Sequence, residues 1–257
     1  MNRRKSVLKE KELVVCLGGG YWGAKGAMIA KNNGASAIVV DKDPECAASE
    51  VADAIITEPR LEKLDIEGVV LYVDDVVGAL VKIFKITTPA WIIPTVPGGF
   101  GGRLVESWLS TNPVELIRSA RLVDSSLMGL PPKLVFSVDR RSGIIISSYM
   151  PEGLRCKTDC SAPRTCPVTG RRKVSPMYEL LEFSICEVVE HYKIFVTKQL
   201  GGIGGIPGSE VREALEYIDK LAPPYSLAIG TSCRCHGLVD FFEVKAAKST
   251  EEGHGLS

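Results

Sequence analysis

The sequence carries no net charge, because its 31 Lys and Arg residues balance its 31 Asp and Glu residues. A neutral chain has no global positive field that would draw it to nucleic acid or to anionic lipid, so neither is expected as a partner. The chain also lacks an apolar run long enough to cross a bilayer. Its first residues lack the apolar stretch and cleavage site of a signal peptide. We therefore expect a cytoplasmic protein without a membrane partner.

Histidine is scarce, and one catalytic pattern is missing. The sequence has three histidines and no G-x-S-x-G nucleophile motif, so no Ser/His/Asp triad can be inferred from it. By contrast, 45% of the 257 residues are hydrophobic and eight are cysteines. This composition predicts a globular protein with one large domain or two modest ones.

Short apolar runs alternate with helical patterns in the first part of the chain. This alternation predicts an α/β fold, with a Rossmann-like parallel sheet in an N-terminal domain at residues 1–130. Pro131-Pro132 favours a boundary, followed by a second α/β domain at 131–247 and a flexible tail at 248–257. The expected strands of the first domain are residues 13–17, 36–40, 54–56, 68–73 and 90–93.

The pattern that predicts secondary structure is weaker from residue 103 onward than in the first part of the chain. Residues 103–110 and 113–122 are expected to form helices, and 134–138 and 144–148 a β-hairpin. A helix at 176–191 and strands at 193–197 and 225–230 complete the second half.

The turn after the first strand reads Gly18-Gly19-Gly20-Tyr21-Trp22-Gly23 and matches G-x-G-x-x-G. Gly18 permits a tight turn, Gly20 lets the backbone approach a pyrophosphate, and Gly23 lets the helix pack close to the strand. The helix N-terminus then presents N–H groups to the phosphates, beside Tyr21 and Trp22. Asp41 ends the second strand, where its carboxylate can bind ribose hydroxyls and would repel a 2′-phosphate. The glycine turn together with Asp41 favours NAD over NADP. Two alternatives stay open: the ligand could be another adenine nucleotide, or the glycines could serve only packing and bind no nucleotide.

Residues 13–57 resemble the NAD-binding domains of potassium-uptake regulators and of siroheme-synthase-type dehydrogenases. In these families a Gly-rich turn, an amphipathic helix and a strand that ends in Asp recur in this order, and Gly18, Gly20, Gly23 and Asp41 match them. The resemblance implies a Rossmann-type NAD-binding domain. It covers about the first third of the chain and implies no substrate or catalytic residue.

Five cysteines fall in two short segments of the second half. The first is Cys156-x3-Cys160-x5-Cys166, and the second is Cys233-x-Cys235 followed by His236. In a reducing compartment such crowding indicates metal or redox chemistry rather than disulfides. The segments could together supply the ligands of one metal centre.

Two kinds of metal centre and unmetallated thiols remain open for this cysteine set. Only the Cys156/Cys160 spacing suits a zinc knuckle, whereas an iron–sulfur cluster tolerates irregular spacing, so iron–sulfur is favoured over zinc. The fourth ligand would then be Cys233 or Cys235, and the fifth sulfur a spare ligand or a reactive thiol. His236 is the candidate for a ligand, an acid–base group or a hydrogen-bond partner of a ligand.

A second glycine-rich stretch at 201–208 is expected to be a loop that leads into a helix capped by Ser209. Such a loop could bind a phosphate or a carboxylate, or could simply be flexible. The residues of this candidate anion-binding loop are Gly202, Gly204, Gly205 and Ser209.

These patterns favour an NAD-dependent oxidoreductase whose cysteine-bound centre acts on a small-molecule substrate or an electron-transfer partner, and whose chains form a homo-oligomer. One alternative is a non-catalytic nucleotide-sensing module with a structural zinc site. Another is a nucleotide-dependent transferase or ligase that would use the second glycine loop for phosphate.

Overall fold

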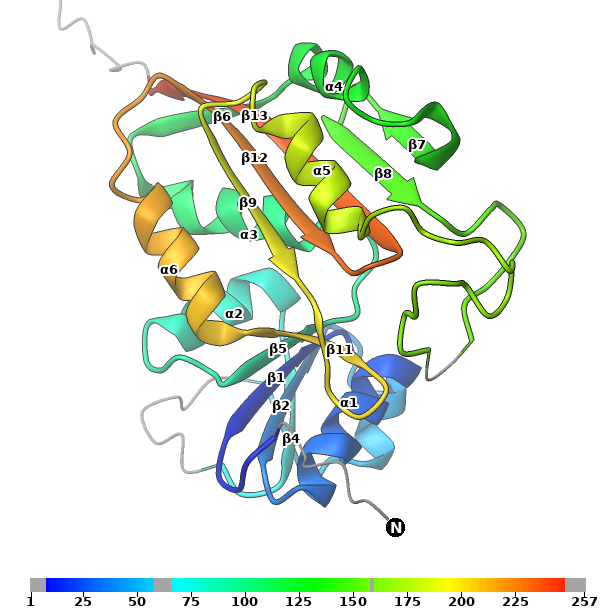
Figure 1. Cartoon of the computed structure of the whole chain (residues 1–257). Coiled ribbons are helices and arrows are strands. Elements are labelled where there is room, and N and C mark those ends of the chain that lie inside the picture. The colour runs from blue at the N-terminus through cyan, green and yellow to red at the C-terminus, as the bar shows by residue number, and fades with distance from the viewer. Residues whose placement is uncertain (1–7, 58–65, 158–159, 248–257) are drawn as a thin grey trace, which may run out of the picture.

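The computed structural model describes residues 8–57, 66–157 and 160–247, which are arranged as Figure 1 shows. Within these residues the chain forms two β-sheets and six α-helices, so the α/β class is confirmed. In these ranges, no helix combines the length and the apolar character that a membrane span requires. The predicted tail at 248–257 lies outside the described residues.

The first sheet is Rossmann-like, with strand order β10-β11-β5-β1-β2-β4-β3. Helix α1 (Tyr21–Asn32) connects its two central strands, and a short 3-10 helix (Ala47–Glu50) follows the second of them. Its parallel strands are β1 (Leu13–Leu17), β2 (Ser36–Asp41), β3 (Ala54–Ile56), β4 (Val69–Val73) and β5 (Trp91–Pro94).

Strand β1 shows why these runs are continuously apolar. Val14 and Cys16 face the hydrophobic cluster that includes α1, whereas Val15 and Leu17 face the cluster on the opposite side of the sheet. All four side chains are fully buried. A parallel strand covered on both faces needs apolar residues at every position, not at alternate ones.

The second sheet is built around the long strand β13 (His236–Ala246), and the path through it runs β7-β8-β13-β12-β9. The first part of β13 pairs with β8 and its last part pairs with β6, while β12 lies along its other edge. The remaining strands are β6 (Val114–Arg118), β7 (Val135–Asp139), β8 (Ile144–Ser148), β9 (His191–Val196) and β12 (Tyr225–Ser232).

One hydrophobic core joins the two sheets. It contains side chains of α2 (Val76–Phe84), α3 (Phe100–Trp108) and α6 (Gly208–Ile218), packed against β1 and β2 on one side and β12 and β13 on the other. A separate core lies under α4 (Ala120–Leu127) and α5 (Met177–Ile185) on the outer face of the second sheet. Figure 1 shows α5 in front of this sheet and α3 behind it. Two further 3-10 helices are Leu109–Thr111 and Pro132–Leu134.

The expected helix at residues 113–122 is wrong. This segment is strand β6 followed by α4, because residues 114–118 complete the edge of β13 more than a hundred residues later in the chain. The β7–β8 hairpin is confirmed. The expected helix at 176–191 is shorter, since residues 191–196 already belong to β9.

Strand pairing crosses the predicted domain boundary at residues 130/131 in both directions. Strand β6 precedes this boundary yet belongs to the second sheet. Strands β10 (Lys198–Gln199) and β11 (Gly204–Pro207) follow it yet extend the first sheet, with β11 antiparallel to β5. The shared core and the exchanged strands fix the two halves against each other.

Candidate functional site

The glycine turn (Gly18–Gly23) has the geometry that its sequence predicts. Gly18 adopts φ +104°, a conformation that side-chain-bearing residues rarely take. A Cβ on Gly23 would overlap the carbonyl oxygen of Gly18, so only glycine lets α1 approach the turn this closely. Thr95, at the end of β5, donates its hydroxyl to the carbonyl of Leu17 at 2.8 Å and so ties the turn to the neighbouring strand.

Gly20 differs from these two glycines, because its surroundings are open. It has φ −67°, which any residue can adopt, and a Cβ added to it meets no described heavy atom within 4 Å. Gly20 is also the N-cap of α1, where no side chain caps the helix and no acidic residue lies in the first turn. The uncapped N–H groups and the helix dipole make this end of α1 suited to an anion.

Asp41 lies beside the same turn. Its carboxylate accepts hydrogen bonds from the backbone N–H groups of Gly19 at 2.5 Å and Asp43 at 3.0 Å. Cys46 packs against Gly19, where a Cβ would overlap its Sγ, and burial raises the pKa of the Cys46 thiol. The carboxylate is therefore held at the edge of the sheet next to the open Gly20.

The two cysteine segments meet. Cys156 lies in the cysteine loop (residues 151–176, described except 158 and 159), and its Sγ lies 3.5 Å from Nε2 of His236, 80 residues away. The Sγ of Cys233 lies 3.3 Å from Nδ1 of the same ring and accepts the backbone N–H of Cys235 at 3.3 Å. His236, the first residue of β13, therefore stands between sulfurs from both segments.

A small thiol cavity of about 10 Å³ lies among these residues. Four of the five sulfurs line it together with the imidazole, and Cys233 does not. Its lining includes Cys156, Cys160, Cys166, Cys235 and His236. Within the described part of the chain, no three or more of these side chains already stand in the arrangement of a metal site.

The thiols of the cluster differ in protonation. A hydrogen bond from the Cys235 thiol, assisted by backbone N–H groups, lowers the pKa of Cys233 to about 6. The same hydrogen bond, together with burial, raises the pKa of Cys235. Burial lowers the pKa of His236, which favours its neutral form. Hydrogen bonds from Thr169 lower the pKa of Cys166.

A large cavity of about 390 Å³ connects the cluster with the first sheet. Trp22 of the glycine turn and Thr95 line one side, and Cys156, Cys233 and His236 line the other. Gly202 and Gly204 also line it, whereas Gly205 and Ser209 do not. Trp22 is therefore the predicted nucleotide-site residue that shares this cavity with the thiols, whereas Gly20 and Asp41 do not line it.

The loop expected at 201–208 and the Ser209 cap are wrong, whereas anion binding by these residues stays a prediction. Gly204 and Gly205 lie in strand β11, and Gly201 and Gly202 form the tight turn of the β10–β11 hairpin, with φ +69° and φ +101°. Helix α6 begins at Gly208 with Pro207 as N-cap, not Ser209, and Glu210 in its first turn pairs with Lys198 at 2.7 Å. The glycines serve hairpin geometry and close packing, and the transferase or ligase interpretation stays an untested alternative.

Two residues of this region were not among the sequence candidates. Thr95 could have been found because it follows β5 at the sheet edge where the glycine turn lies. Lys173 is only 5% exposed and donates to the carbonyl of Pro163. Its only sequence signal is the basic run 171–173 near Cys166, and such a run usually indicates a solvated surface.

Comparison with known proteins shows the family. Residues 104–245 match the AF_1314_C family model, described as "Uncharacterized protein, C-terminal domain", and the chain belongs to this family. A relative from Archaeoglobus fulgidus, described as "Uncharacterized protein", is 27% identical over 230 residues, which are 88% of this chain and 96% of the relative. No solved structure matches the chain. The matched family region contains both cysteine segments and His236, and the glycine turn lies before it.

Proposed function

We propose that this protein is an NAD-binding redox protein whose clustered cysteines hold a metal centre. The observation that carries the proposal is the large cavity, because Trp22, beside Gly20 in the glycine turn, and the cysteine cluster both line it. A dinucleotide that reaches from Gly20 into this cavity would bring its nicotinamide toward Cys156, Cys233 and His236. Cofactor and metal centre would then meet in one cavity.

The nucleotide half of the proposal depends on three features of the first sheet. The N-terminus of α1 is uncapped, Gly20 leaves room for a close approach, and Asp41 is fixed at the end of β2. A pyrophosphate would accept hydrogen bonds from the helix N–H groups, and the ribose hydroxyls would donate to Asp41. The carboxylate makes this site more suited to NAD than to NADP.

The metal half depends on which of the five sulfurs line the thiol cavity, three of which, Cys156, Cys160 and Cys235, also line the large cavity. Cys156, Cys160, Cys166 and Cys235 line the thiol cavity and form the proposed ligand set for an iron–sulfur centre. Cys233 lines only the large cavity and stays available to substrate or cofactor. Such a centre would supply one-electron chemistry beside the nucleotide, held by Cys156, Cys160, Cys166 and Cys235. His236 is proposed to position Cys156 and Cys233 and to hold or accept a proton beside the cavity.

A second candidate has its own observation. The thiol cavity has room for about one water-sized particle, which suits a single ion better than a multinuclear cluster. Four thiolates around one ion are a zinc site with no open coordination position. The protein would then be a nucleotide-sensing module in which the metal fixes the cysteine loop and no electron is transferred.

Elemental analysis and a visible spectrum of the full chain, purified without oxygen, separate these candidates. Bound iron with broad visible absorption supports the redox protein, whereas stoichiometric zinc in a colourless protein supports the sensor. A protein that contains neither iron nor zinc would overturn both candidates. An NADH-dependent reduction of an artificial one-electron acceptor then tests turnover.

Nucleotide binding is tested with Gly20→Ala, followed by calorimetry with NAD and NADH. The added Cβ meets no described atom within 4 Å, so the thermal stability is expected to remain unchanged. The methyl group would, however, occupy the space through which the pyrophosphate would approach. We expect binding to weaken about tenfold or more, the effect of roughly one lost strong contact. Asn33→Ala, at the other end of α1, is the matched control and should bind normally. Equal affinity in wild type and Gly20→Ala would contradict a nucleotide at this turn.

A further inference from the structure

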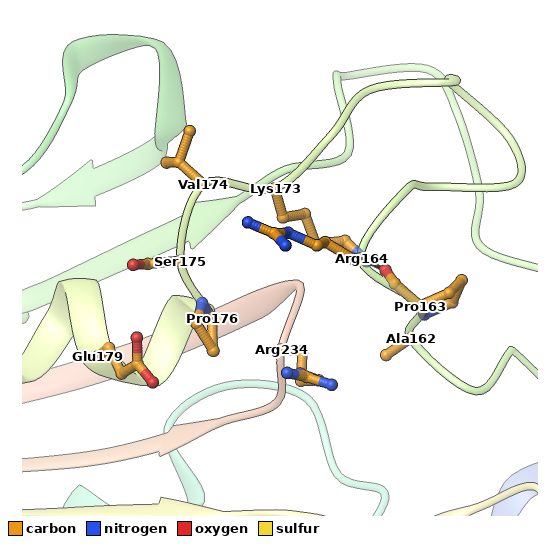
Figure 2. Close-up of a pocket in the computed structure, with 9 residues that line it drawn as sticks. All are labelled: Ala162, Pro163, Arg164, Lys173, Val174, Ser175, Pro176, Glu179 and Arg234. Atoms are coloured by element: carbon orange, nitrogen blue, oxygen red, sulfur yellow. Dashed lines mark hydrogen bonds between the residues drawn. The ribbon is translucent and has the colours of Figure 1, made fainter.

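A third cavity, distinct from the two described above, lies between the cysteine loop and the start of α5. It has a volume of about 280 Å³ and shares Ala162 with the lining of the large cavity. Figure 2 shows Arg164 and Lys173 on the cysteine loop, Arg234 below them on the β12–β13 turn, and Glu179 on α5. We refer to this space as the cationic cavity, because three cations and one carboxylate line it.

The two arginines are held in place by their backbones, and their guanidinium groups have no partner among the residues that the structure describes. The carbonyl of Arg164 accepts from the N–H of Lys173 at 2.9 Å, and the carbonyl of Arg234 accepts from the N–H of Met177 at 3.2 Å. Among the described residues, neither guanidinium has a hydrogen bond or an ion pair. A planar guanidinium matches the paired oxygens of a phosphate or carboxylate, and two of them from different segments define a specific position for such a group.

Lys173 adds a buried charge. Its side chain is 5% exposed, and its ammonium donates to the carbonyl of Pro163 and also forms a hydrogen bond with the Cys235 thiol. A buried ammonium is costly unless an opposite charge compensates it. Glu179 provides one carboxylate for three cations, so the lining keeps a net positive charge.

The start of α5 contributes further donors. Its N-cap is Pro176, no side chain caps the helix, and both Pro176 and Ser175 line the cavity. The N–H of Met177 already donates to the carbonyl of Arg234, and Glu179 lies in the first turn, so the helix dipole and the remaining uncapped N–H groups give modest support to an anion on the same side as the arginines.

We propose that the cationic cavity is a binding site for a small oxyanion, a phosphate or carboxylate group held between Arg164 and Arg234. The site adjoins the cysteine cluster: Lys173 lines both this cavity and the thiol cavity, and Arg234 stands between Cys233 and Cys235. The role of the anion as the substrate, or as a part of it, rests on the proposed function, whereas its binding does not. The substrate class is accordingly a small phosphorylated or carboxylated molecule.

Titration calorimetry of the full chain with inorganic pyrophosphate and with malonate tests the site and distinguishes a phosphate from a carboxylate. Saturable binding of either anion is expected, and Arg164→Gln and Arg234→Gln should each weaken it about tenfold or more, as expected for a lost charge-assisted pair. Arg234→Lys keeps the charge without the planar fork and should restore only part of the affinity.

Arg171→Gln is the matched control. It removes the same charge from the same loop, but Arg171 does not line the cavity, and its backbone rather than its side chain bonds Cys166. Unchanged binding in this variant supports the site. An equal loss in all three glutamine variants, or no saturable binding of either anion to wild type, overturns it.

The metal content of each sample separates this proposal from the proposed function. Anion binding to a protein without bound metal would contradict only the metal centre. A metal-loaded protein that binds neither anion would contradict only the cationic cavity.

Discussion

The guanidinium of Arg118 lies 2.6 Å from the carboxylate of Asp240, which is 1% exposed. This pair joins β6 to β13 at the point where the second sheet meets α3. Arg118 has further partners in Glu106 at 2.8 Å and the carbonyl of Ser142 at 3.0 Å. Among the described residues, Asp240 otherwise accepts only a long hydrogen bond from the N–H of Gly102 at 3.3 Å. Asp240 therefore depends on Arg118 more than Arg118 depends on Asp240.

The first prediction is that removing Arg118 lowers the free energy of unfolding more than removing the charge of Asp240 does. Arg118→Met leaves a buried carboxylate without its cation and should lower the free energy of unfolding by about 3–5 kcal/mol. Asp240→Asn leaves Arg118 with Glu106 and should cost about 1–2 kcal/mol. Urea unfolding measures both. The exposed pair Arg140–Asp124, with side chains 58% and 55% exposed, is the control, and Arg140→Met should cost less than about 1 kcal/mol. Similar losses of unfolding free energy in all three variants would contradict the unequal dependence of Asp240 and Arg118 on each other.

The second prediction concerns pH. Burial raises the pKa of the Asp240 carboxyl above 3.8, and Arg118 partly opposes this effect. In Arg118→Met that opposition is lost, so the pKa rises further. A carboxyl that binds its proton more tightly in the folded state contributes its full stability below the unfolded pKa and loses it as pH rises through the folded pKa. The cost of Arg118→Met should therefore grow as pH rises above about 4, the unfolded pKa of an aspartate, through the raised pKa of the folded state.

The control for this pH dependence is the double variant Arg118→Met/Asp240→Asn, which has no carboxyl at that position. Its cost relative to Asp240→Asn should stay constant over the same range in urea unfolding. If the loss of unfolding free energy in Arg118→Met fell as pH rises, the predicted upward shift of the Asp240 pKa would be wrong.

The third prediction compares two helical glycines. Alanine is the better helix former by about 1 kcal/mol, so Gly78→Ala in α2, where a Cβ meets nothing closer than 3.5 Å, should stabilise the protein by up to that amount. A Cβ on Gly102 in α3 would overlap the Asp240 carboxylate. Gly102→Ala should therefore destabilise by about 1–3 kcal/mol, the range of an overpacked core. Thermal unfolding of the two variants should shift in opposite directions, and shifts of the same sign would contradict the packing argument.

The features that the sequence predicts correctly depend on local pattern. The continuous apolar run of β1, the glycine turn and the position of Asp41 follow from steric rules that act within a few dozen residues, and so does the hairpin β7–β8. The glycine loop at 201–208 shows the limit of such rules. The same residue type serves anion-binding loops and tight hairpins, and only the pairing of β11 with β5, far away in sequence, decides between them.

Strand β6 and the long β13 were missed for a related reason. The β6 segment, Val-Glu-Leu-Ile-Arg, has apolar positions compatible with a helix, and its pairing with β13 overrides this local preference. The cationic cavity is also invisible in the sequence. Arg164 and Arg234 are 70 positions apart, and each one alone is an ordinary surface arginine. Lys173 is in a basic run that gives no sign of its burial.

The fourth prediction divides the cysteines by the cavity that they line. Cys166 lines only the thiol cavity and belongs to the proposed ligand set, so Cys166→Ser should weaken metal retention by more than roughly 100-fold, the upper end of the effect of changes around a ligand. Cys233 lines only the large cavity, so Cys233→Ser should keep the metal and lose reactivity toward a thiol reagent in that cavity. Cys186 is exposed at the end of α5, and Cys186→Ser should behave as wild type.

Metal content after dialysis against a chelator measures these differences, with the thermal stability of each variant recorded in parallel. Because a bound metal stabilises the folded state, Cys166→Ser should also lose the stability that wild type loses on chelation, while Cys233→Ser should retain it. Loss of metal in Cys233→Ser with retention in Cys166→Ser would reverse the assignment and make Cys233 the ligand. Equal retention in all three variants would place the metal, if bound, outside the cysteine cluster.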